Sequence, residues 1–194
     1  MSVSASLPLT VSPLRLHLRD TFRIARESSD VRDNLLIRIH DEDGTQGLGE
    51  AAPSQYYNQS AESVSRALAS VNWQRLSEPF LVDELLGNLK CALADQSAGL
   101  AAIDMALHDL IGKRLGVPLF RLFGFNGQNA PVTSYTIGLA SLDEMRRKTE
   151  AAADYSILKV KLGTDQDRDI IATIRAVTSV PIRVDANAAW TVDE

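Results

Sequence analysis

The first 52 residues show the alternation of apolar and polar side chains that is typical of β-strands. Apolar residues alternate through 14–18, a second apolar run covers 35–39, and 46–52 follows the turn-forming pair Asp43-Gly44. Successive side chains of a strand face opposite sides, so each run has one apolar face. We therefore predict an antiparallel meander that belongs to a small α+β unit.

From Ser60 the apolar residues take the spacing of helices. We predict one helix after Ser60 and two more over 81–93 and 101–115. Gly116 and Pro118 are typical of a helix end and stop the third. Its apolar stripe comprises Ile103, Ala106, Leu107, Leu110 and Ile111.

Beyond Asn126-Gly127 strands and helices alternate. Apolar strands are predicted over 132–137, 157–162 and 182–185, and their starts are 25 residues apart. Between them lie predicted helices, one from a capping box at Ser141 and Glu144 to about residue 153 and one over 165–177. This spacing is typical of consecutive right-handed βα units in a parallel sheet or barrel.

The number of these units bears on the architecture. Eight units would need about 200 residues from position 132 to complete a (β/α)8 barrel. Thr191 and Glu194 form a capping box that predicts one more helix where the sequence ends. The barrel interpretation therefore requires further strands beyond this chain. The alternative is a smaller open sheet, although the turn at Gly163 lacks the glycine-rich phosphate loop of a doubly wound fold.

Composition excludes several classes of protein. Of 194 residues, 45% are hydrophobic and 23% charged, which is ordinary for a globular protein, and the net charge is -5. Scattered basic residues on an acidic chain argue against nucleic-acid binding, and apolar runs are too short for a membrane span. The single cysteine, Cys91, rules out an internal disulfide and fits a cytoplasmic location.

Two lysines on one predicted strand are the first candidates for chemistry. Lys159 and Lys161 are two residues apart and share one face, whereas Leu158, Val160 and Leu162 form the other. If helices cover the apolar face, the lysines point into the barrel, where an unpaired charge costs several kcal/mol. The alternative is that they are charged guards on an edge strand.

Asp185 is the second candidate, because it ends the next predicted strand. Barrel enzymes place catalytic groups at the carboxyl ends of strands, and Asn187 follows on the same side. A carboxylate there can bind a hard cation such as Mg2+. The alternative is a loop or helix-capping aspartate bonded to the backbone.

Together these groups suit the chemistry of carbon acids. A lysine removes a proton near neutral pH only when nearby positive charge disfavours its charged form, as a second lysine and a divalent cation would. The cation would also hold a substrate carboxylate and stabilise the enolate formed when the α-proton leaves.

The runs Lys159-Val160-Lys161-Leu162-Gly163 and Arg183-Val184-Asp185-Ala186-Asn187 resemble those of the enolase superfamily, muconate lactonizing enzyme subgroup. Matching motifs also occur, in order, at 47–51, 102–110 and 116–120. The resemblance implies an α+β capping domain over 1–125. It implies that 126–194 is the first part of a modified (β/α)8, TIM-like barrel, with three of its strands.

The resemblance also implies roles for individual residues. Lys161 corresponds to the general base, Lys159 to the partner that tunes it, and Asp185 to a ligand of Mg2+, with Asn187 supporting them. The remaining metal ligands and an opposing base are expected on later strands, so this chain alone is expected to be inactive.

The capping-domain loops and the first barrel strand resemble those of dipeptide epimerases. Arg26, rather than Arg23, would meet a substrate carboxylate, Tyr56 would cover the site and Thr136 would line it. The alternative for Arg26 is a solvated loop arginine, and for Tyr56 packing between domains.

The implied activity is an isomerase reaction, Mg2+-dependent epimerisation of a dipeptide of the L-Ala-D/L-Glu type, with a small-molecule substrate. The alternatives are muconate cycloisomerase, o-succinylbenzoate synthase, N-acylamino acid racemase or an inactive truncated product. We also expect a homo-oligomer.

Overall fold

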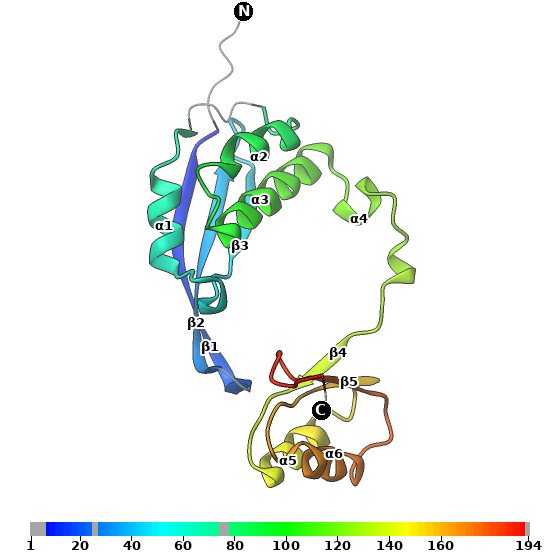
Figure 1. The fold of residues 1–194 in the computed structure, drawn as a ribbon. Helices are drawn as coiled ribbons and strands as arrows, with labels where there is room; N and C mark the ends of the chain where they lie inside the picture. The colour runs from blue at the N-terminus through cyan, green and yellow to red at the C-terminus, as the bar shows by residue number, and fades with distance from the viewer. Residues whose placement is uncertain (1–6, 25–26, 74–77, 193–194) are drawn as a thin grey trace, which may run out of the picture. The chain divides into compact units, whose positions relative to one another are not determined.

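The computed structural model describes residues 7–24, 27–73 and 78–192. The chain forms two compact units, each considered by itself (Figure 1). The first comprises residues 1–16 and 31–129. The second comprises residues 130–194 together with 17–30, so the outer part of the first hairpin groups with the second unit.

The first unit is built on the predicted antiparallel meander. Its strands are β1 (Leu9–Ile24), β2 (Glu27–His40) and β3 (Gln46–Ala51), in the order β1-β2-β3. The hairpin strands are longer than the two predicted runs, because 19–24 and 27–34 lack an apolar alternation and nevertheless form strand. Gly44 has φ 86°, the left-handed conformation that the predicted turn requires.

Helices cover the apolar face of this sheet. They are α1 (Ala61–Ala69), α2 (Val82–Lys90) and α3 (Ser97–Leu115). This unit also contains the short helix α4 (Leu119–Leu122) and the 3-10 turns η1 (Gln55–Tyr57) and η3 (Gly127–Asn129). All five residues of the predicted stripe on α3 are buried, and Gly116 ends that helix with φ 63°. The predicted stripe and helix end are therefore confirmed.

Two glycines allow α3 to approach β3 closely. Gly47 and Gly49 face the helix from alternate positions of β3. A Cβ on Gly49 would lie 1.8 Å from the Ala102 carbonyl oxygen, and one on Gly47 would lie 2.0 Å from that of Ala106. These contacts are with the helix backbone, which cannot move aside without displacing the whole helix.

We therefore expect Gly49→Ala to lower the free energy of unfolding by about 3 kcal/mol, measured by urea denaturation. Gly87→Ala is the matched control, because a Cβ on this α2 glycine would meet no atom within 4 Å. Alanine has a higher helix propensity than glycine, so the free energy of unfolding of the control should equal that of the wild type or exceed it by up to about 1 kcal/mol. Equal stability of Gly49→Ala and wild type would contradict the close packing.

An ion pair joins the end of α3 to the turn after β2. The Arg114 guanidinium donates two hydrogen bonds to the carboxylate of Asp41, whose side chain is 7% exposed. These bonds hold the pKa of the Asp41 carboxyl below its usual range, although burial acts in the opposite direction. A carboxyl with a lowered folded-state pKa stabilises the protein above its unfolded pKa, near pH 4.

Asp41→Asn should accordingly lower the free energy of unfolding by about 2 kcal/mol at neutral pH. The stabilisation from the wild-type pair is lost as pH falls through the folded-state pKa of Asp41. The free energies of unfolding of the variant and the wild type should therefore converge below about pH 4. Urea denaturation across this range, with the exposed Asp95→Asn as control, measures the difference. A difference that does not change with pH would show that the pair is not its source.

The second unit consists of alternating strands and helices. Its elements are β4 (Ser134–Ile137), α5 (Leu142–Ala151), β5 (Ile157–Lys161), α6 (Asp167–Arg175) and β6 (Ile182–Asp185). The strands are parallel and their order is β4-β5-β6, as expected for the first strands of a barrel. The predicted fold class, an α+β capping domain followed by part of a barrel, is confirmed. The side chain of Glu194, half of the last predicted capping box, lies outside the described residues.

One face of the parallel sheet is buried beneath α5 and α6. Alternate residues of β5, Leu158 and Val160, pack with the apolar faces of these helices. At the start of α5, Ser141 Oγ accepts the Glu144 N–H, as its predicted cap requires. The packed residues include Ile137, Met145, Leu162, Ile170 and Ile174.

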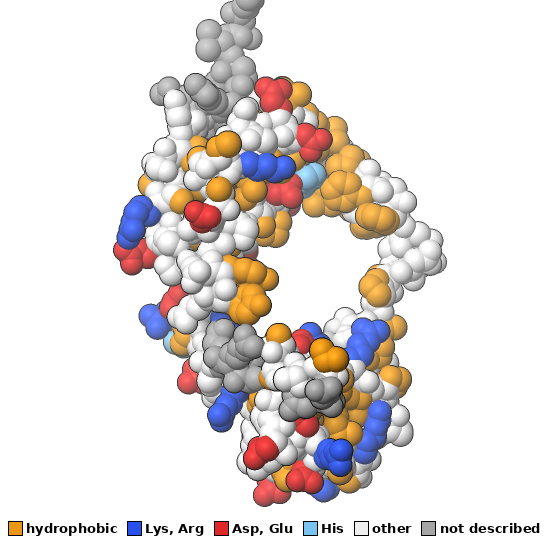
Figure 2. All heavy atoms as spheres, in the orientation of Figure 1, with side chains coloured by type: hydrophobic (Ala, Val, Ile, Leu, Met, Phe, Trp, Pro, Cys, Tyr) orange, Lys and Arg blue, Asp and Glu red, His pale blue; other side chains and the backbone are white. Residues whose placement is uncertain are grey.

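Exposed apolar side chains gather over α4 and the segment after it (Figure 2). They include Phe123 and Phe125, whose side chains are 51% and 68% exposed. No helix among residues 7–24, 27–73 and 78–192 has the length and apolar character needed to span a bilayer.

Candidate active site

The three parallel strands end at one edge of their sheet. β4 ends at Ile137, β5 at Lys161 and β6 at Asp185. Parallel pairing places Thr136 beside Lys159 and Lys161 beside Asp185. Paired residues of neighbouring strands face the same side, so these polar side chains share the face opposite α5 and α6.

The two lysines converge on one carboxylate oxygen. Asp185 Oδ2 lies 2.8 Å from Lys159 Nζ and 2.9 Å from Lys161 Nζ. The Lys161 side chain is only 9% exposed, whereas that of Lys159 is 38% exposed. The ammonium groups are therefore close neighbours, and the one at Lys161 is the more deeply buried.

Asn187 completes the surroundings of the buried ammonium group. Its Oδ1 accepts a hydrogen bond from Lys161 Nζ at 2.9 Å, and its backbone N–H donates to Asp185 Oδ1 at 2.9 Å. Hydrogen bonds from Lys159 and Lys161, with that from the Asn187 backbone, hold the pKa of the Asp185 carboxyl far below its usual range. The carboxylate is therefore ionised wherever the protein is folded near neutral pH.

The alternatives raised by the sequence can be compared with this geometry. Lys159 and Lys161 are not guards of a sheet edge, because β5 lies between β4 and β6. For Asp185 both descriptions apply: Oδ1 bonds to the local backbone and Oδ2 bonds to the two lysines.

A further cation on this face was missed by the sequence reasoning. Arg183 pairs in register with Lys159, and its Nη1 donates to Ser134 Oγ at 2.9 Å. Because Arg183 is two residues before Asp185 on β6, strand alternation was a sufficient signal to find it. Lys159, Lys161 and Arg183 give this face an excess of positive charge that suits an anionic substrate.

The three predicted substrate-binding residues lie in different parts of the chain. Thr136 lies on β4 next to Lys159, on the same face as the lysines. Tyr56 lies in η1 of the first unit, where its side chain is exposed and meets the Tyr57 ring edge-on at 5.0 Å. Arg26 lies outside the described residues.

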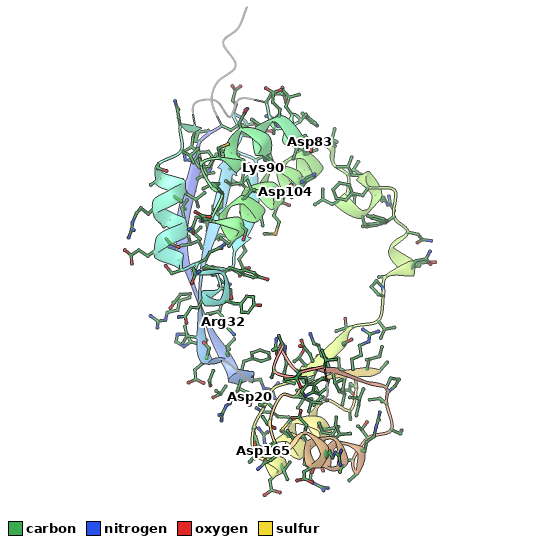
Figure 3. The ribbon with its side chains drawn as sticks, in the orientation of Figure 1. Asp20, Arg32, Asp83, Lys90, Asp104 and Asp165 are labelled. Atoms are coloured by element: carbon green, nitrogen blue, oxygen red, sulfur yellow. The ribbon has the colours of Figure 1, made fainter. Side chains whose placement is uncertain are left out.

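The outer hairpin is anchored at the carboxyl end of β4. The Leu139 N–H donates to the Arg23 carbonyl oxygen at 2.9 Å, and Asp20, labelled in Figure 3, lies 3.6 Å from Arg147 Nη2. A Cβ on Gly138 would lie 3.3 Å from that same Arg23 oxygen. This segment of the hairpin therefore contacts the edge at which Lys161 and Asp185 lie.

The residues present fit a divalent metal ion only in part. Asp185 supplies a carboxylate, which is a suitable ligand for Mg2+. Within the described parts of the chain there is no group of three or more His, Cys, Asp or Glu side chains that could hold a metal ion. Further oxygen ligands would have to come from elsewhere.

Sequence comparison assigns the chain to a family. The model of the mandelate racemase/muconate lactonizing enzyme N-terminal domain matches residues 8–124. The chain belongs to this family. The resemblance to the muconate lactonizing enzyme subgroup of the enolase superfamily is thereby confirmed.

Curated relatives of this chain include named epimerases. The chain is 40% identical over 189 residues to the L-Ala-D/L-Glu epimerase of Bacteroides thetaiotaomicron, covering 97% of this chain and 49% of that relative. The chain thus spans about half the length of the curated relatives it matches.

Solved structures of named epimerases show the same fold. A dipeptide epimerase from Methylococcus capsulatus, complexed with Mg and L-Arg-D-Lys, has a TM-score of 0.83 and 30% identity, covering 97% of this chain and 56% of its own. A substrate-liganded L-Ala-D/L-Glu epimerase from Bacillus subtilis has a TM-score of 0.87 and 26% identity, and the match covers 96% of this chain and 54% of that chain.

The buried ammonium group gives a prediction about stability. Asp185→Ala removes the anionic partner of Lys161, and we expect it to lower the free energy of unfolding by about 3 kcal/mol. Adding Lys161→Met removes the buried charge while keeping an apolar side chain, so the double variant should regain stability. Urea denaturation measures both, and a double variant less stable than Asp185→Ala would contradict this account.

Proposed function

We propose that the protein containing this chain is a Mg2+-dependent dipeptide epimerase of the L-Ala-D/L-Glu type. The observation that carries the proposal is the buried Lys161 side chain beside Lys159 and Asp185 at the carboxyl edge of the parallel sheet. The epimerases among the relatives support the choice of reaction, and their Mg and dipeptide complexes support the cofactor and substrate class.

In the proposed reaction the substrate carboxylate binds at the positive face of the sheet. Lys161 Nζ, in its neutral form, removes the proton from the adjacent α-carbon, which leaves an enolate. The Lys159 ammonium partly neutralises the negative charge that develops. Asp185 is the proposed Mg2+ ligand within this chain, and the ion, when bound, would polarise the substrate carboxylate.

Inversion requires that a proton return to the opposite face of the α-carbon. Lys159 and Lys161 project from one face of one strand, so neither is placed to serve the other side. We propose that the opposing acid and the remaining metal ligands come from the part of the protein that the matched relatives have beyond the span of this chain. The 194 residues alone should then fail to epimerise a dipeptide.

The predicted substrate-binding residues are assigned more coarsely. Arg26 and Tyr56 remain proposed substrate contacts, and Thr136 is proposed to line the pocket next to Lys159. The homo-oligomeric state and the cytoplasmic location stay predictions.

The proposal is tested by exchange of the substrate α-proton with deuterium from the solvent. The complete protein with Mg2+ should exchange and epimerise L-Ala-L-Glu, and Lys161→Ala should slow exchange by about a thousandfold. Lys90→Ala, an exposed change on α2, is the matched control and should leave the rate unchanged.

Two outcomes would contradict the assignment. A complete protein that exchanges no member of a dipeptide panel, or exchanges only N-acylamino acids, is not a dipeptide epimerase. Full exchange from both stereoisomers by Lys161→Ala would show that Lys161 is not the base.

A further inference from the structure

The loop after β6 has an unusual backbone. Asn187 and Ala188 have φ values of 50° and 57°, in the left-handed region. Asparagine adopts this conformation readily, whereas for alanine it costs about 1 kcal/mol or more. Contacts made by the neighbouring residues must therefore hold the loop in this shape.

Hydrogen bonds hold the loop at several points along its length. At its start the Asn187 N–H donates to Asp185 Oδ1, and across its turn the Ala189 N–H donates to the Ala186 carbonyl at 3.0 Å. At its far end the Trp190 indole Nε1–H donates to Asp167 Oδ2 at 2.9 Å. This last bond ties the far end of the loop to the start of α6.

Asp167 is itself fixed by the loop that follows Lys161. Its carboxylate accepts the Gly163 N–H at 3.0 and 2.9 Å and the Thr164 N–H at 2.8 Å, and Thr164 Oγ1 lies 3.0 Å away. Burial raises the pKa of the Asp167 carboxyl, but the bonds from Thr164, Gly163 and Trp190 outweigh it and lower the pKa overall. One ionised carboxylate therefore connects the loops after β5 and β6.

These two loops follow the strands that bear the candidate base and the candidate metal ligand. The left-handed turn brings Asn187 Oδ1 to 2.9 Å from Lys161 Nζ. The bond from Trp190 to Asp167 lies two residues beyond Ala188, at the far end of the same loop. The contact of Asn187 with Lys161 and the bond that ties the loop to α6 thus belong to one strained segment.

We propose that Asp167 and Trp190 form a clasp that holds the 186–190 loop in its strained conformation and so positions Asn187 against Lys161. They are positioning residues and do not touch the substrate. The expected effect on kcat rests on the proposed function, whereas the expected effect on the loop conformation does not.

The kinetic test uses the complete protein with Mg2+ and its dipeptide substrate. Trp190→Phe keeps an aromatic side chain but removes the indole N–H donor. It should lower kcat between about tenfold and a hundredfold and change KM less than about twofold. Ala188→Gly relieves the left-handed strain and should restore kcat about fivefold in the Trp190→Phe background. Trp73→Phe is the matched control, because its indole donates to the Leu68 carbonyl at 3.0 Å in the first unit.

The structural test uses amide and indole NMR signals, with two tryptophans in the chain. Asp167→Asn should shift the Trp190 indole signal and leave that of Trp73 in place, and Trp190→Phe should shift the Asn187 backbone amide. Wild-type kcat in Trp190→Phe, no rescue by Ala188→Gly, or an unmoved Asn187 amide would each overturn the clasp. If the wild-type protein exchanges no substrate, the proposed function fails and the NMR signals alone decide the clasp.

Discussion

The candidate site depends on keeping an ammonium group buried at the end of a β-strand. Lys161 lies on β5 between two paired strands, and its side chain is almost fully enclosed. Removing such a group from water costs several kcal/mol unless charge and hydrogen bonds compensate. Asp185 supplies the charge and Asn187 a second acceptor. The positions of β6 and its following loop are therefore linked to the position of the lysine.

The ion pairs of Asp185 also determine which ligands the carboxyl edge of the sheet can bind. Asp185 is shared between Lys159 and Lys161, so its charge is already balanced by two cations, and Arg183 adds a third on the same face. The surplus favours an anionic ligand such as a substrate carboxylate. The same carboxylate is the natural place for a hard cation, whose further ligands the described residues do not provide.

The first unit solves a different physical problem, which is to bring a long helix against a small sheet. Gly47 and Gly49 leave room for the α3 backbone, and Arg114 ties the end of the helix to Asp41. Neither feature contributes chemistry. The hairpin that begins in this unit continues to the carboxyl edge of the second, where the Arg23 carbonyl accepts the Leu139 N–H.

Much of this arrangement is encoded locally and could be predicted. Periodicity placed the strands and helices of both units, because side-chain alternation and the helical repeat are properties of neighbouring residues. Strand alternation likewise put Lys159 and Lys161 on one face. The same alternation along β6 places Arg183 on the face of Asp185.

Other features depend on residues that are distant in the sequence. No apolar alternation predicts the strand structure of residues 19–24 and 27–34. The grouping of 17–30 with the second unit follows from contacts around Gly138. The left-handed turn at Ala188 contradicts its local preference, and Trp190 of the same loop donates to Asp167, more than a helix away. The sequence by itself determined which side chains could do chemistry. Only the tertiary structure decided which of them meet, because burial and hydrogen bonding between separate strands set those distances.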